Sequence, residues 1–240
     1  DAEEIIKLVI SEKVNIIFTS AGNPAKYTGK LKEHGIIVVH VVSSLRFAKK
    51  AESAGVDAIV AEGFEAGGHN GVDETTTMVL IPLIRKHTSI PLIAAGGIAT
   101  RSAMAASIAL GADGVQLGSV FAGSLESSAH ENFKQSIIDC REGQTQLVLK
   151  KISPVRMIKN KLFLQIKALE DNGANALSLE EFAGKGIAKK GIFEGDTENG
   201  MLEIGQAAAL INERKAVQRI MKDLLEDYNK SIAQMNQQKF

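Results

Sequence analysis

The first half of this 240-residue chain alternates between short apolar runs and segments with helical periodicity, and this alternation limits the folds open to it. The predicted strands are residues 14–20, 36–42, 56–61, 92–95 and 115–117, and the predicted helices are residues 1–13, 24–33, 45–54, 75–87 and 102–110. The linkers between them are short enough for parallel crossover connections. The series therefore predicts an α/β fold, either a (β/α)8 barrel or an open doubly wound sheet.

The residues that follow the predicted strands favour the barrel, because glycine, serine or asparagine stands at most strand ends, and barrel sites all lie on that face. A barrel needs eight strands, and the sequence provides five. We therefore expect a TIM (β/α)8 barrel whose first three strands are missing from this chain, plus a C-terminal helical extension. Residues 1–124 would hold barrel strands 4–8 with their helices. Residues 125–240 would form the final barrel helix and a mostly helical extension packed on the barrel.

The composition argues against several classes of function. Lys and Arg (28) balance Asp and Glu (28), so the zero net charge predicts no binding to nucleic acid or to a membrane surface. No apolar run approaches the roughly 20 residues of a membrane-spanning helix. The single cysteine, Cys140, excludes an internal disulfide and fits a cytoplasmic location. One cysteine and five scattered histidines give no metal-ligand spacing, so no metal site is predicted.

The second half of the chain carries different patterns. Residues 124–140 are expected to be helical, residues 170–200 irregular and glycine-rich, and residues 206–235 a long amphipathic helix. Residues 150–167 contain six Lys or Arg residues and no acid. This pattern fits either a solvated helix face or a contact with an acidic carrier protein or a nucleotide phosphate. The amphipathic stretch predicts core packing or a contact with a second copy in a homodimer.

A glycine-rich stretch with one histidine, residues 61–71, directly follows the third predicted strand. Glycine allows positive φ and close approach of the backbone to another group. His69 is the one side chain in the stretch that titrates near neutral pH. The stretch therefore predicts either a ligand pocket with His69 at its reactive side or a flexible turn with an incidental histidine.

Two later strand ends have the features of a phosphate site. Residues 95–98 place backbone N–H groups just ahead of a predicted helix, and Gly118 with Ser119 offers two more N–H groups and a hydroxyl. In barrels the phosphate site is usually built by the loops after strands seven and eight. If the last predicted strand, residues 115–117, is the eighth, then the loops at residues 95–98 and 118–119 are the loops after strands seven and eight.

Three sequence motifs occur in a fixed order along the chain. They are Glu-Gly-Phe-Glu-Ala-Gly-Gly-His at residues 62–69, Ile-Ala-Ala-Gly-Gly-Ile at residues 93–98 and Gly-Val-Gln-Leu-Gly-Ser at residues 114–119. Together they resemble the nitronate monooxygenase family (formerly 2-nitropropane dioxygenases), which also contains the flavin-dependent enoyl-acyl carrier protein reductase II. Ala-Gly-Asn-Pro at residues 21–24 matches the same pattern.

The resemblance implies an FMN-binding TIM barrel in which His69 is the active-site histidine. The residues that it implies for binding the cofactor are Gly22, Asn23, Glu62, Ala66, Gly67, Gly68, Ala95, Gly96, Gly97, Gln116, Gly118 and Ser119.

The branch of the family is indicated by motifs at residues 75–78 and 154–160 and by glycines at 195 and 205, which look like the reductase. This branch implies that NADH or NADPH reduces FMN, which then reduces an enoyl thioester on an acyl carrier protein in fatty acid synthesis. His69 would donate a proton to the α-carbon or orient the thioester carbonyl. Two alternatives stay open: oxidation of alkyl nitronates with O2 beside the same histidine, and a non-catalytic flavin- or phosphate-binding barrel fragment.

Overall fold

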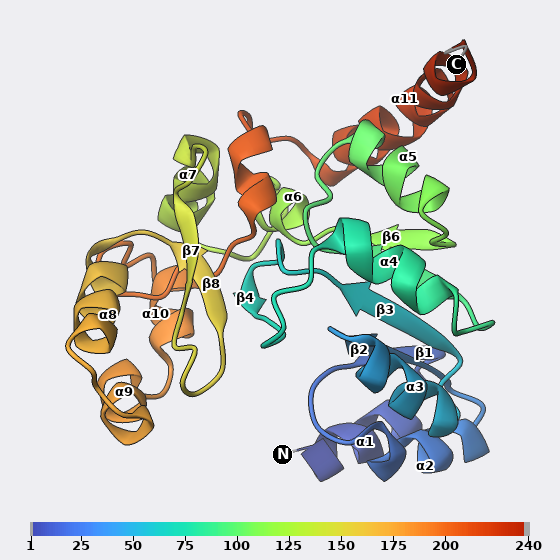
Figure 1. Ribbon diagram of the computed structural model, residues 1–240, viewed down its shortest axis with the longest axis horizontal. Helices are drawn as coiled ribbons and strands as arrows, with labels where there is room; N and C mark the ends of the chain where they lie inside the picture. The colour runs from blue at the N-terminus through green and yellow to red at the C-terminus, as the bar shows by residue number, and fades with distance from the viewer. Residues whose placement is uncertain (1, 238–240) are drawn as a thin grey trace. The chain divides into compact units, whose positions relative to one another are not determined.

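In the computed structural model, which describes residues 2–237, the chain forms two compact units (Figure 1). The first unit comprises Asp1–Gly63, Thr75–Ala95 and Ser107–Gln116, and the second comprises Phe64–Glu74, Gly96–Ala106 and Leu117–Phe240. The division expected at residue 124 stays a prediction.

A five-stranded parallel sheet forms the core of the first unit (Figure 1). Its strands, in spatial order, are β1 (Ile16–Thr19), β2 (Ile37–Val42), β3 (Ala58–Glu62), β5 (Leu92–Ala95) and β6 (Gly114–Gln116). A doubly wound sheet reverses its strand order part-way, whereas a barrel adds each strand beside the one before it. The predicted α/β class is therefore confirmed, and the strand order is that of a barrel. The described residues form an open sheet with β1 and β6 at its edges, not a closed barrel.

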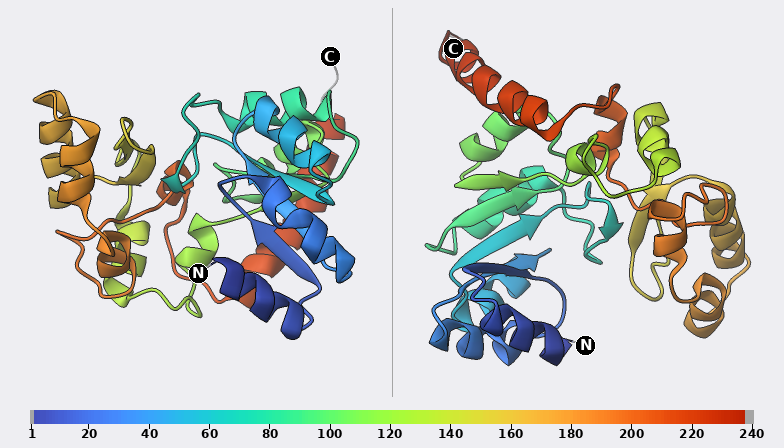
Figure 2. Two further views of the ribbon diagram at one scale, coloured as in Figure 1. Left: turned by 90° about the horizontal axis from the view of Figure 1, so that it is seen from below. Right: turned by 180° about the vertical axis from the view of Figure 1, so that it is seen from behind.

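Helices α2, α3 and α4 lie along one face of this sheet (Figures 1 and 2). The helical elements of this unit are α1 (Ala2–Ser11), the 3₁₀ turn η1 (Pro24–Lys26), α2 (Thr28–Glu33), α3 (Leu45–Ser53) and α4 (Thr77–Arg85), and α5 (Arg101–Ala109) is shared between the two units. Ser44 caps α3 as expected, its hydroxyl accepting a hydrogen bond from the Phe47 N–H at 3.3 Å. The single helix expected over residues 24–33 is instead divided at Tyr27 into η1 and α2.

Apolar side chains are buried on both faces of the sheet. Strand residues that point to one face, such as Val38 and Ile59, are fully buried. On the other face Val39, Ala58, Val60 and Ala95 form a small apolar cluster. Because successive side chains alternate between faces, Glu62 lies on the same face as Val60, at the carboxyl end of β3.

The second unit combines a small antiparallel sheet with helices. Its strand order is β4 (Gly68–His69), β8 (Val155–Ile158) and β7 (Thr145–Val148). Its further helices are α6 (Ser119–Ala122), α7 (Glu131–Asp139), α8 (Lys161–Asp171), α9 (Ala176–Ala183), α10 (Ile187–Ile192), the 3₁₀ turn η2 (Gln206–Leu210) and α11 (Val217–Gln237). The β7–β8 hairpin packs with α8 and α9 around buried residues that include Met157, Phe163 and Leu179 (Figure 1).

Several expectations for the second half of the chain were wrong, and the helices expected over residues 124–140 and 206–235 were right only in part. The basic stretch at 150–167 is not one helix face, because it comprises a turn, strand β8 and the first half of α8. Three of its charges are paired or buried: Lys150 forms an ion pair with Glu74, Lys167 forms one with Asp171, and Arg156 is buried in β8. Residues 124–130 precede α7 outside any helix, α9 and α10 occupy the stretch expected to be irregular, and η2 and α11 replace the long helix.

The described part of the chain contains neither a helix suited to span a membrane nor a cluster of metal-ligating side chains. Among residues 2–237, no helix combines the length and the apolar character needed to cross a bilayer. Within the same residues, no three histidine, cysteine or acidic side chains gather as metal ligands would. Cys140 is a buried free thiol at the end of α7, and burial raises its pKa, which fits the expected packing role.

Candidate active site

Three of the predicted cofactor residues lie level with one another at the carboxyl ends of neighbouring strands. In the sheet of the first unit, Glu62 pairs with Ala95, and Ala95 pairs with Gln116. Burial raises the pKa of Glu62 to about 7, because the charged carboxylate loses hydration at the end of an apolar face. A carboxyl group that titrates near neutral pH at this edge of a parallel sheet has the character of a functional group.

The other two predicted residues of the first unit, Gly22 and Asn23, follow β1. Gly22 has φ of +68°, and the Asn23 side chain caps η1 by accepting a hydrogen bond from the Ala25 N–H at 3.4 Å. Both residues line a mostly apolar pocket of about 480 Å³ together with Thr19 and His40. Nδ1 of the buried His40 lies 2.7 Å from the Thr19 hydroxyl, and burial lowers the pKa of His40.

His69 lies in the second unit, in a loop of residues 64–70 (the histidine loop) that is tied to the β7–β8 hairpin. Strand β4 pairs with β8, so that Gly68 is opposite Arg156 and the exposed His69 is opposite Val155. The Asn70 N–H donates to the carbonyl of Pro154 at 2.8 Å. The Asn70 side-chain amide donates to the carbonyls of residues 66 and 68 at 2.9 and 3.1 Å. The sequence predicts a flexible or ligand-bound loop here, and the structure gives it a hydrogen-bonded strand.

A segment from late in the chain, residues 202–206, runs against this loop. A Cβ atom on Gly67 would overlap the backbone of Ile204, so only glycine fits at this close approach. The Gln206 N–H donates to the Glu65 carbonyl at 2.9 Å. The Gly205 N–H donates to the Ser119 hydroxyl at 3.2 Å. Two of the predicted residues, Gly67 and Ser119, thus both contact the segment 202–206, whose position the sequence patterns did not predict.

Arg156 holds the first residue of the loop. Its side chain is 2% exposed, and its Nε and Nη2 donate to the Phe64 carbonyl at 3.2 and 2.9 Å. The guanidinium also lies 4.5 Å from the centroid of the Phe64 ring. Planar, multiple hydrogen bonds of this kind require arginine, since lysine is a single point of charge.

The next loop, after β5, holds two further predicted residues in unusual backbone conformations. Gly96 and Gly97 have φ of +93° and +73°. A Cβ atom on Gly97 would lie 3.3 Å from the Cβ atom of Glu65, so this loop contacts the histidine loop inside the second unit. At Gly118, at the start of α6, no atom other than those of the adjacent residues lies within 4 Å of where a Cβ would be. This leaves open space beside the N–H groups of Gly118 and Ser119.

The site has loops rich in glycine at the carboxyl ends of parallel strands, with one histidine, and this is also the pattern of a known family. Residues 2–227 match the sequence model described as nitronate monooxygenase. The chain belongs to this family. A probable nitronate monooxygenase from Staphylococcus saprophyticus is 30% identical over 95% of this chain and 68% of the relative. A nitronate monooxygenase from Paraburkholderia phytofirmans is 38% identical over 56% of this chain and 39% of the relative.

A solved structure extends the likeness over nearly the whole chain. FabK from Thermotoga maritima is 38% identical, with a TM-score of 0.92, and the match covers 98% of this chain and 74% of that protein. These findings confirm the resemblance to the nitronate monooxygenase family, whose members are flavin-dependent oxidoreductases. The roles expected of His69 and of the cofactor-binding residues stay predictions.

Three residues that organise the nitronate monooxygenase family motif in this chain were not singled out from the sequence. Asn70 and Arg156 bind loop carbonyls, and Glu203 lies beside Gly68 and His69. Arg156 was hidden in a run of surface-like basic residues. Glu203 precedes Gly205 and Gln206, which were noted only as a likeness to the reductase branch, and no local pattern shows that residues 130 positions apart are in contact.

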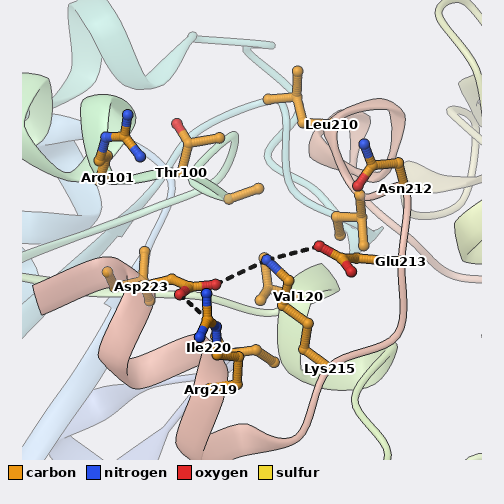
Figure 3. Close-up of a pocket in the computed structure, with 13 residues that line it drawn as sticks. Thr100, Arg101, Val120, Leu210, Asn212, Glu213, Lys215, Arg219, Ile220 and Asp223 are labelled. Carbon is orange, nitrogen blue, oxygen red and sulfur yellow. Dashed lines mark hydrogen bonds and ion pairs between the residues drawn. The ribbon is translucent and has the colours of Figure 1, made fainter. Parts of the chain in front are cut away.

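A separate cavity of about 510 Å³ lies in the second unit beyond Gly97 (Figure 3). Its wall carries Thr100 and Arg101 on one side and residues of the 210–224 segment on the other. Figure 3 shows Lys215 between two carboxylates, with its ammonium 3.0 Å from Glu213 and 2.8 Å from Asp223. None of the predicted cofactor residues lines this cavity.

Proposed function

We propose that this chain is an FMN-dependent enoyl thioester reductase of the enoyl-acyl carrier protein reductase II type. The observation that carries the proposal is the 38% identity to FabK over 98% of the chain, with a TM-score of 0.92. FabK is the reductase branch of the family, and the curated nitronate monooxygenase that aligns over a comparable length is 30% identical. The likeness of the 154–160 motif to the reductase supports the same branch, and in this chain its Arg156 donates to the Phe64 carbonyl.

The residues present fit a phosphorylated flavin. Gly96 and Gly97 adopt left-handed conformations directly after a strand, and the space beside Gly118 is open. These backbone N–H groups would bind the phosphate of FMN. Glu62 and Gln116, level at the ends of β3 and β6, would hydrogen-bond the polar part of the cofactor.

The reaction would reduce a carbon–carbon double bond. When bound, FMN would supply the hydride chemistry, with NADH or NADPH as the source of the two electrons and the β-carbon of the enoyl thioester as the acceptor of the hydride. His69 would then donate a proton to the α-carbon, so that the double bond gains one hydride and one proton. An imidazole suits this task because its ordinary pKa lies close to neutral pH. The thioester is proposed to arrive on an acyl carrier protein. The free, buried Cys140 supports a cytoplasmic location for the protein.

The second candidate is oxidation of alkyl nitronates, which the family match and the curated relatives favour. Both reactions use His69 at the same place, so kinetics must separate them. Under anaerobic conditions, NADH or NADPH should bleach the flavin absorbance, and a crotonyl thioester should then restore it. If reduced nicotinamide leaves the flavin oxidised while an alkyl nitronate consumes O2, the reductase proposal fails. A preparation without flavin absorbance, even after incubation with FMN, would favour the non-catalytic alternative.

A further inference from the structure

The segment 202–206 is held against the histidine loop by contacts on both of its sides. The Ile158 N–H of β8 donates to the Leu202 carbonyl at 2.9 Å, and the Gln206 N–H donates to the Glu65 carbonyl at 2.9 Å. Leu202 and Ile204 are buried in the apolar cluster around Phe133. Because both neighbours of Glu203 point into that cluster, the Glu203 side chain projects to the other side of the segment.

On that side lie Gly68 and His69. One carboxylate oxygen of Glu203 lies 2.9 Å from the position that a Cβ atom on Gly68 would take. Any side chain at position 68 would therefore displace the carboxylate, and Gly68 also has φ of +75°, which disfavours other residues. Gly68 thus makes the space in which the Glu203 carboxylate lies next to the residue that carries the imidazole.

Glu203 and His69 also interact electrostatically. Partial burial raises the pKa of Glu203, and the nearby charge of His69 acts in the opposite direction. A carboxylate beside an imidazole commonly accepts a hydrogen bond from one ring N–H, which fixes the tautomer and orientation of the ring. The guanidinium of the buried Arg156, which lies opposite Gly68 on β8, donates to the Phe64 carbonyl.

We propose that Glu203 is the positioning residue of His69: its carboxylate accepts a hydrogen bond from the imidazole and directs the other ring nitrogen toward the substrate. This inference rests on the proposed function, in which His69 supplies a proton. Glu203 acts through the ring and does not itself touch the reacting carbons. Glu203 is fixed by the segment and His69 by its pairing with β8, so that the carboxylate and the residue carrying the imidazole are held near each other before substrate arrives.

The test separates the two half-reactions of the loaded enzyme. Glu203→Leu removes the acceptor, Glu203→Gln keeps an acceptor oxygen of nearly the same shape, and Glu198→Gln changes an exposed carboxylate as a matched control. With rapid mixing, Glu203→Leu should slow reoxidation of the flavin by crotonyl thioester roughly tenfold or more. Reduction by NADH or NADPH should stay unchanged, and Glu203→Gln should recover most of the lost rate. In a His69→Ala background, Glu203→Leu should cause no further loss.

A readout without turnover tests the same pair. The ring nitrogens of ¹⁵N-labelled His69, assigned by comparison with His69→Ala, should show a single tautomer in the wild type and a tautomer mixture in Glu203→Leu. Unchanged ring signals would overturn the proposal, as would an additive rate loss in the His69→Ala background. If Glu203→Leu does not fold, the same spectra of Glu203→Asp decide, because the shorter side chain withdraws the carboxylate from the ring and should also give a tautomer mixture; unchanged ring signals would again overturn the proposal.

Failure of the proposed function is distinguishable from failure of this inference. A wild-type enzyme that oxidises nitronates but reduces no thioester would refute the reductase, while the ring signals and the nitronate rates of the same variants would still report on Glu203. Conversely, an active reductase whose His69 signals ignore Glu203 would refute only the positioning role.

Discussion

The carboxyl group of Glu62 should make this protein less stable as the pH rises through neutrality. Its folded pKa of about 7 lies above the value of 4.5 for an exposed glutamate, because burial disfavours the charged form. The folded state therefore holds the proton more tightly than the unfolded state does. The stabilising contribution of the protonated Glu62 is then fully present below pH 4.5 and is lost as the pH rises toward 7.

The size of the effect follows from the two pKa values. A difference of about 2.5 units corresponds to about 3 kcal/mol, since one unit is about 1.4 kcal/mol. Glu62→Gln removes the ionisation and keeps the size of the side chain. We expect the variant and the wild type to be equally pH-sensitive below pH 4.5, and the difference in their stability to shift by about 3 kcal/mol in favour of the variant between pH 4.5 and pH 8.

The assay is urea unfolding of the chain without added flavin or nicotinamide, measured at several pH values between 4.5 and 8. Glu33→Gln provides the matched control, because Glu33 is an exposed carboxylate at the end of α2. The free energy of unfolding of Glu62→Gln, relative to the wild type, should increase with pH mainly between 4.5 and 7. A difference that does not depend on pH, or one that favours the wild type at pH 8, would refute the assignment of Glu62 as a desolvated carboxyl.

Two further predictions concern the packing of the histidine loop. Gly67→Ala should destabilise the protein by about 3 kcal/mol in urea unfolding, because the new methyl group overlaps the backbone of Ile204 and the segment must shift. Arg156→Met should cost about 3 kcal/mol in the same assay, because the Phe64 carbonyl loses a charged donor and the aromatic ring loses its cation.

Each of these has a control and a contradicting outcome. Gly29→Ala lies in helix α2 with open space around it and should raise stability by about 0.5–1 kcal/mol. If Gly67→Ala behaves like Gly29→Ala, the close approach of the segment is not real. Arg156→Lys keeps the charge but loses the planar fork, so its stability should lie between the wild type and Arg156→Met; a fully stable Arg156→Met would contradict the loop-holding role.

The parallel sheet was predictable because its signals are local. An apolar run followed by a polar turn and a helix marks each strand, and Ser44 marks a helix start through its own side chain. The helix over residues 24–33 was only partly right, since no local pattern indicated that Tyr27 would interrupt it.

The small sheet of the second unit was not predictable in this way. Strand β8 interleaves Arg156 with apolar residues, and its arginine is buried because a carbonyl and an aromatic ring from residue 64 surround it. That environment comes from a residue 92 positions earlier, so the sequence near Arg156 carries no trace of it. Glu203 was missed for the same reason, because its partners lie at positions 68 and 69.

The glycines of the histidine loop have a structural role besides any ligand binding, because they allow the loop's carbonyl groups to be hydrogen-bonded. The carbonyl of Phe64 accepts from Arg156, that of Glu65 accepts from Gln206, and those of residues 66 and 68 accept from Asn70. Backbone acceptors that are shielded from water must be paired, and here donors from two other segments and from the loop's own Asn70 meet one short loop. Gly67 and Gly68 let those segments approach. A loop fixed by its own chain on these sides needs little further ordering when substrate binds, which is the condition for His69 to act from a defined position.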